Sequence, residues 1–116
     1  MAKKRTKLWL LPVILAAAGF CYSDNCTIQT VPVTLVCPAL PEAFSGLRIV
    51  QISDLHGRVF GKDHTALLAA VRKAEPDLIA VTGDLADEDT ALPTLRPLLE
   101  GLAALAPVFY VTGNHE

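Results

Sequence analysis

The sequence lacks several patterns that define common classes of binding protein. Its three cysteines form no Cys-x-x-Cys pair, which argues against a structural zinc site. Segment 54–64, between a predicted strand and a predicted helix, has no glycine fingerprint, so a nucleotide-binding α/β domain is disfavoured. Four of the ten basic residues precede Leu8, and from Ser23 onward six basic residues face twelve acidic ones, a net charge of −6. The chain from Ser23 onward, called the body below, is therefore expected to bind nucleic acid poorly, because such binding needs basic side chains that contact phosphates. Its negative charge suits metal cations.

The N-terminus places its cations directly before a run without charge. Lys3, Lys4, Arg5 and Lys7 precede the apolar segment 8–22. This segment is short for a membrane-spanning helix, which needs roughly 20 residues, and it resembles the apolar region of a signal peptide. The small residues 16–18 offer a cleavage site; the alternatives are an uncleaved anchor and a buried core helix. We therefore expect residues 1–23 to be a signal peptide or membrane anchor, with the body on the extracytoplasmic side or secreted.

The segment between the N-terminal run and the body predicts an edge strand. Residues 27–36 are rich in Val, Thr and Ile, and Pro32 restricts a strand to an edge position. Cys26 and Cys37 flank this segment, and a straight strand would hold them far beyond the roughly 7 Å that a disulfide allows. No disulfide is therefore predicted, and a turn-rich connector follows over 38–46.

The body alternates apolar runs with helical patterns. Strands are predicted over 47–53, 77–83 and 107–113, and helices over 63–76 and 90–105. Asp63 is a candidate N-cap of the first helix, and Leu67, Leu68 and Val71 form its apolar face. Pro97 is expected to bend or delay the second helix.

Polar residues follow each strand at a constant interval. Asp54, Asp84 and Asn114 are 30 residues apart, the length of one βαβ unit. Continuous apolar strands between helices indicate a parallel βαβαβ sheet covered on both faces. The carboxyl ends of parallel strands lie along one edge, so His56 and His115 should join the three residues there.

The residues expected at this edge predict a metal site. Carboxylates, a carboxamide and imidazoles suit Mn, Fe, Zn or Ni better than Ca. Each residue alone is an ordinary turn or cap residue, and His64 is best explained as a surface or core histidine. What indicates function is that the three polar blocks, which begin at Asp54, Asp84 and Asn114, each follow a predicted strand.

These blocks resemble the first three signature blocks of the calcineurin-like metallophosphoesterase superfamily: Asp-Leu-His at 54–56, Gly-Asp-Leu-Ala-Asp at 83–87 and Gly-Asn-His-Glu at 113–116. The resemblance covers roughly 27–116, and the basic, apolar N-terminus resembles a membrane-anchored bacterial branch. It implies the first half of an αββα sandwich, with residues 24–116 as the N-terminal part of a truncated phosphoesterase domain that hydrolyses phosphomonoesters or phosphodiesters.

The resemblance also implies roles for individual residues. Two divalent metal ions are expected, with Asp54 and His56 on the first, Asp84 on both and Asn114 on the second. His115 is expected beside the scissile phosphate, where it protonates the leaving oxygen or stabilises its charge. Asp87 is expected to orient His115.

The histidine content departs from the superfamily pattern. Later signature blocks supply a lone histidine and a Gly-His-x-His block, whereas this chain has only His56, His64 and His115. We therefore expect a fragment that binds metal weakly and turns over no phosphoester by itself. The alternative is a non-catalytic, membrane-anchored α/β binding module, favoured if the full gene lacks those blocks. A membrane address makes a lipid-linked or cell-wall phosphodiester the expected substrate.

Overall fold

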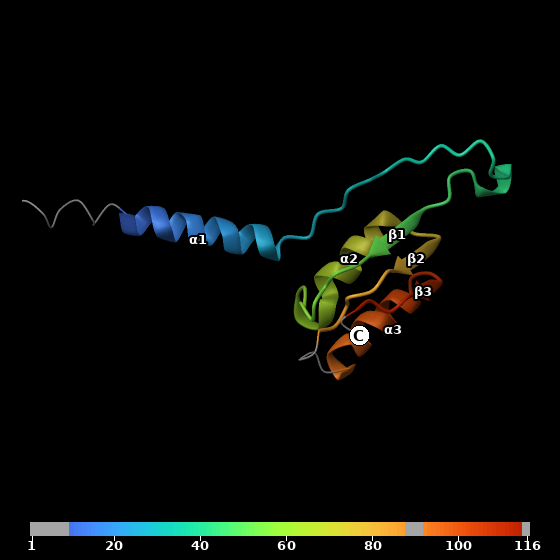
Figure 1. The fold of residues 1–116 in the computed structure, drawn as a ribbon. Helices are drawn as coiled ribbons and strands as arrows, with labels where there is room; N and C mark the ends of the chain where they lie inside the picture. Colours follow the sequence, from blue (N-terminus) through green and yellow to red (C-terminus); the bar gives the residue numbers. More distant parts are fainter. Residues whose placement is uncertain (1–9, 88–91, 115–116) are drawn as a thin grey trace, which may run out of the picture.

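A βαβαβ unit follows an N-terminal helix and a long extended segment (Figure 1). The computed structural model describes residues 10–87 and 92–114. The elements, in order, are α1 Leu10–Cys26, the 3-10 helix η1 Glu42–Phe44, β1 Ile49–Ile52, the 3-10 helix η2 Lys62–His64, α2 Thr65–Ala74, β2 Leu78–Val81, α3 Leu92–Ala103 and β3 Val108–Tyr110.

The three strands form one parallel sheet in the order β1-β2-β3. The register pairs Ile52 with Val81 and Val81 with Tyr110, so the carboxyl ends of all three strands lie side by side. This confirms the predicted parallel βαβαβ topology. It also brings the residues after each strand to one edge of the sheet, because each crossover returns the chain to the same end.

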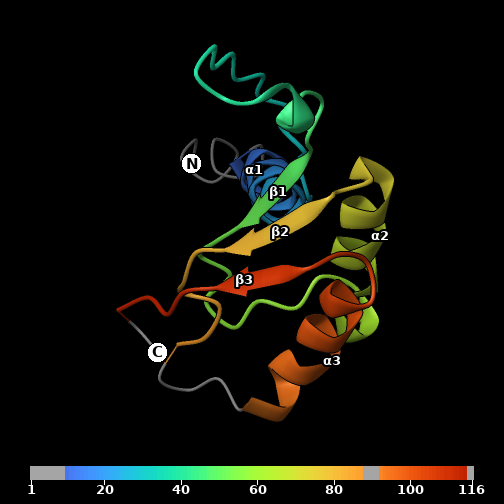
Figure 2. The same ribbon diagram turned by 90° about the vertical axis from the view of Figure 1, so that its right-hand side faces the viewer.

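Both helices of the unit cover the same face of the sheet (Figure 2). Alternate strand residues, the apolar stripes of α2 and α3 and two residues of the loop after β2 make the core: Ile52, Leu67, Val71, Ile79, Val81, Leu85, Ala86, Leu95, Leu98 and Leu102. The opposite face carries Ile49, Phe109 and Val111, which are 56%, 61% and 64% exposed. The expectation of a sheet covered on both faces is therefore wrong for the described residues.

The predicted edge strand over 27–36 is also wrong. The segment is extended, but within the described part of the chain its backbone pairs with no other strand. Val31, Val33 and Leu35 are 74–87% exposed, so the alternating apolar pattern is not packed against the rest of the protein. A β pattern reflects packing against neighbours more than an intrinsic backbone preference, and Pro32 removes one donor besides. The segment borders an apolar groove of about 980 Å³, with β1 and α2 on its other side.

Helix α1 is apolar from Leu10 to Tyr22 and continues through the predicted polar joint at 23–26. Its side chains from Leu11 to Leu15 are exposed. Among the described residues, no helix reaches the length and hydropathy that crossing a bilayer requires. Cys37 is a free and exposed thiol.

Helix α2 begins differently from the prediction. Asp63 lies inside η2 with a left-handed backbone (φ 52°), and His64, also left-handed, occupies the N-cap position without a capping side-chain bond. The chain turns too sharply there for Asp63 to act as the cap. The predicted apolar face is confirmed for Leu67 and Val71, which are buried, and Leu68, which is half-buried.

Helix α3 runs continuously from Leu92 to Ala103 with Pro97 inside it, so the predicted delay at this proline does not occur. Proline removes one backbone donor and opposes a helix interior. Leu95, Leu98 and Leu102 are at most 5% exposed, and the burial of this stripe offsets that cost.

His64 is fully buried, and neither ring nitrogen has a hydrogen-bond partner within the structure. A buried polar group without a partner costs roughly 1–3 kcal/mol. We expect His64→Leu to raise the free energy of unfolding by about 1 kcal/mol, because it removes a buried polar group without a partner. The expected gain is at the low end of the range because leucine tolerates the left-handed backbone less well than histidine does. Urea denaturation checks this, with Leu98→Ala as the control, which should lose about 2–5 kcal/mol. A less stable His64→Leu variant would show that the imidazole is satisfied in solution.

Candidate metal centre

Backbone hydrogen bonds join the loop after β1 to the loop after β2. The amide of Asp54 donates to the Gly83 carbonyl at 3.1 Å, that of His56 to Asp84 at 2.9 Å, and that of Gly57 to the Leu85 carbonyl at 2.8 Å. The strands have already ended at Ile52 and Val81, so the pairing continues past the regular sheet. The relative position of the two loops is therefore fixed by main-chain contacts.

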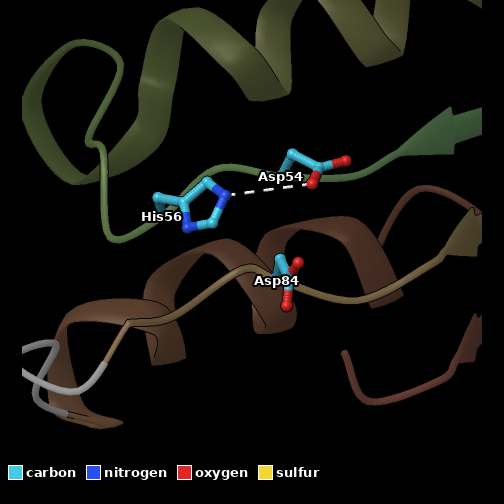
Figure 3. A group of neighbouring side chains, drawn as sticks. All are labelled: Asp54, His56 and Asp84. Atoms are coloured by element: carbon cyan, nitrogen blue, oxygen red, sulfur yellow. Dashed lines mark ion pairs between the residues drawn. The ribbon is translucent and has the colours of Figure 1, made fainter. Parts of the chain in front are cut away.

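Three side chains from these loops converge (Figure 3). Asp54, His56 and Asp84 each present a ligand atom, and these atoms lie within 4.8 Å of one another. His56 Nε2 is 3.8 Å from Asp54 Oδ1, and the imidazole points toward that carboxylate. Asp54 and His56 are exposed and Asp84 is half-buried, so a cation could reach them from solvent.

All three residues have a left-handed backbone. The φ angles are 56° at Asp54, 46° at His56 and 52° at Asp84. Residues other than glycine seldom adopt this region, although Asp, Asn and His do so more readily than most. Here the conformation turns each loop sharply after its strand and keeps the side chains at the sheet edge. Such strain is typical of sites where the surrounding structure fixes the geometry for function.

Ser53 also contributes to the arrangement. Its hydroxyl donates a hydrogen bond to Asp54 Oδ2, while the other carboxylate oxygen, Oδ1, faces His56. The sequence indicated only that Ser53 ends a strand. A serine beside an aspartate is a common pair, so the sequence held no signal for this contact.

The loop after β3 lies against Asp84 on its other side. A Cβ placed on Gly113 would lie 2.5 Å from the Asp84 amide nitrogen and 2.7 Å from its Cγ, and one on Gly83 would lie 2.7 Å from the Gly113 Cα. The two glycines therefore allow the loops to meet backbone to backbone. Asn114, the predicted ligand of the second ion, follows Gly113 directly and is exposed.

The remaining predicted residues are placed less fully. Asp87 is half-buried three residues after Asp84. His115 and Glu116 lie outside the described residues. His64 is fully buried, so of the surface and core positions that the sequence left open it takes the core position.

The donor set fits a divalent metal ion. Two carboxylates and one imidazole provide the mixed oxygen and nitrogen ligands that suit Mn, Fe or Zn. A cation between the two carboxylates also removes their mutual repulsion. The loops hold the donors close together through main-chain bonds, so the site is preformed.

Removing one carboxylate should therefore have opposite effects with and without metal. In EDTA, we expect Asp84→Asn to raise the free energy of unfolding by up to about 1 kcal/mol, because it removes a like-charge contact near solvent. In millimolar Mn²⁺, the wild-type chain should gain thermal stability and the variant should not. Thermal unfolding with and without Mn²⁺ measures both effects, and Asp77→Asn is a control remote from the cluster. Equal stabilisation of Asp84→Asn and wild type by Mn²⁺ would rule Asp84 out as a ligand.

Comparison with known proteins gives one family. The family model for calcineurin-like phosphoesterases matches residues 47–116. The chain is 32% identical, over 76% of its length, to a zebrafish (Danio rerio) transmembrane protein with metallophosphoesterase domain. It is 29% identical, over 89% of its length, to the uncharacterized metallophosphoesterase YkuE of Bacillus subtilis. It is 38% identical, over 60% of its length, to the 3',5'-cyclic adenosine monophosphate phosphodiesterase CpdA of Escherichia coli.

These matches cover only part of each relative. The chain spans 21% of the zebrafish protein, 39% of YkuE and 30% of CpdA. No solved structure gives a significant match. The family model nevertheless includes the loops that carry Asp54, His56 and Asp84, together with all three strands. From the matched residues, the parallel sheet and the cluster at its edge, we conclude that the chain belongs to the calcineurin-like phosphoesterase family.

Proposed function

We propose that the whole protein hydrolyses phosphoester bonds with the help of two divalent metal ions bound at the edge of the sheet. The observation that carries this proposal is the convergence of Asp54, His56 and Asp84 from two loops that are fixed by backbone hydrogen bonds. Membership of the phosphoesterase family supports the reaction type. The relatives named as phosphoesterases support the same class.

The proposed ligands divide between the two ions. Asp54 and His56 would hold the first ion, Asp84 would contribute to both, and Asn114 would hold the second. Bound ions of this kind polarise the phosphoester and lower the pKa of a water molecule. The half-buried position of Asp84, between the other two loops, agrees with a shared role.

The proposed roles of the protein's own groups concern the leaving oxygen. His115 follows Asn114 and would donate a proton to that oxygen or stabilise its developing charge. Asp87 would accept a hydrogen bond from His115 and so hold the ring in orientation. In this proposal a water molecule, rather than a side chain, is the nucleophile. The Ser53 hydroxyl donates a hydrogen bond to Asp54, so we assign Ser53 a supporting contact to that ligand.

Hydrolysis by the native protein tests this proposal. We expect cleavage of bis(p-nitrophenyl) phosphate in Mn²⁺, loss of cleavage in EDTA and recovery when Mn²⁺ is restored. His115→Ala should reduce kcat by about 10²–10⁴-fold with metal affinity retained, because a general acid typically contributes that much. Asp77 precedes β2, at the end of the sheet opposite the proposed ligands. Asp77→Asn should therefore leave kcat unchanged. Absence of metal-dependent cleavage would favour a non-catalytic binding module.

The 116-residue chain should behave differently from the native protein in the same assay. It holds three histidines, and none of them is in the Gly-His-x-His block that the superfamily resemblance calls for. The chain alone is therefore expected to bind Mn²⁺ weakly and to give no turnover. Chelator-sensitive hydrolysis by the purified chain would contradict this proposal.

We further propose that residues 1–23 direct the protein to the cell membrane with residues 24–116 outside the cytoplasm. The apolar helix α1, with exposed leucine and valine side chains, and the cations before it support this address. The zebrafish relative is named as a transmembrane protein, which agrees with membrane association of that protein. In this setting the substrate is a lipid-linked or cell-wall phosphodiester.

Fractionation of source cells tests the membrane address. The native protein should sediment with membranes, resist extraction by high salt and be cleaved by protease added to intact cells or spheroplasts. A cytoplasmic protein of the same cells should stay protected in the same samples. Recovery in the soluble cytoplasmic fraction would contradict the address, and a strong preference for soluble over lipid phosphodiesters would contradict the substrate class.

A further inference from the structure

The carboxylate of Asp84 occupies the space where any side chain on Gly113 would have to be. The nearest atom to a Cβ built on Gly113 is Asp84 Oδ1, followed by the Asp84 amide nitrogen at 2.5 Å and Cγ at 2.7 Å. Real Cβ atoms essentially never approach other atoms this closely, so an alanine at position 113 would have to displace Asp84 or its backbone. All three of the nearest atoms belong to this one residue.

Backbone conformation does not explain the glycine. Gly83 has a φ of 92°, where any other residue is strained, but Gly113 is not among the described glycines with positive φ. The φ at 113 therefore does not itself require glycine. The three atoms nearest to a side chain there all belong to Asp84.

We infer that Gly113 is a positioning residue for Asp84, keeping its carboxylate directed at the proposed metal site. Contacts on two sides constrain Asp84. The Asp84 carbonyl accepts the His56 amide on the β1 side, while Gly113 approaches the carboxylate on the β3 side. With Gly113 replaced, the carboxylate would rotate or shift away from Asp54 and His56. This inference rests on the proposed function, since it gives Asp84 a metal to bind.

Two other glycines provide matched controls. The atoms nearest to a Cβ on Gly101 belong to the Leu68 side chain, at 2.5 and 2.8 Å for its methyl carbons, within the packing between α2 and α3. A Cβ on Gly46 would meet nothing within 4 Å, although its φ is 80°. Gly101→Ala therefore reproduces steric crowding away from the site, and Gly46→Ala reproduces the loss of a glycine without crowding.

The test measures Mn²⁺ binding to the full chain by the electron paramagnetic resonance signal of free Mn²⁺. We expect Gly113→Ala to raise the Mn²⁺ dissociation constant by about 10–100-fold, the usual effect of losing a group that orients a ligand. Gly101→Ala and Gly46→Ala should bind Mn²⁺ as wild type does, even where they unfold more easily. A folded Gly113→Ala chain with unchanged Mn²⁺ affinity would overturn the inference.

A second measurement needs no metal and separates this inference from the proposed function. The change in unfolding free energy caused by Gly113→Ala is compared in the wild-type and Asp84→Ala backgrounds, in EDTA. The cost should be clearly smaller without the Asp84 carboxylate, and an equal cost in both backgrounds would overturn the inference. If the wild-type chain binds no Mn²⁺ at all, the proposed metal centre is contradicted. The double-mutant comparison in EDTA then still decides whether Gly113 constrains Asp84.

Discussion

The candidate site depends on one constraint, the main-chain pairing that continues past the ends of β1 and β2. Three amides on the first loop donate to three carbonyls on the second, so Asp54 and His56 keep a fixed position relative to Asp84. Backbone donors and acceptors near a protein surface are satisfied here by each other rather than by water. The ligand geometry is therefore a property of the fold, and a cation entering the site has little ordering left to impose.

Buried neighbours hold the strained loops in place. Leu85 and Ala86, directly after Asp84, are 1% and 8% exposed, and the Leu85 carbonyl accepts the Gly57 amide. The half-buried Asp84 is thus anchored by buried apolar residues one and two positions after it in sequence. The left-handed backbone at three ligand positions costs free energy, and the packing of the following residues offsets it.

The sequence predicts the assembly of the site better than its details. Parallel topology and the 30-residue interval are enough to bring Asp54, His56 and Asp84 to one edge, and the structure does so. The strand at 27–36 was mispredicted because an apolar alternation forms a strand only when a partner is in reach. Asp63 was mispredicted as a cap because a left-handed turn at η2 depends on tertiary contacts. The approach of Gly113 to Asp84 joins loops about 30 residues apart, and no local pattern reports such a distance.

The left-handed backbone at Asp54 and Asp84 bears on how this site would be lost in evolution. Asparagine is the residue that best shares aspartate's tolerance of that conformation. A single nucleotide change converts an aspartate codon into an asparagine codon. Such a replacement would keep the turn and remove a negative charge from the cluster, so natural selection for folding would not oppose it. Relatives that have become inactive, but remain well folded, should therefore be sought first among sequences with asparagine at these two positions.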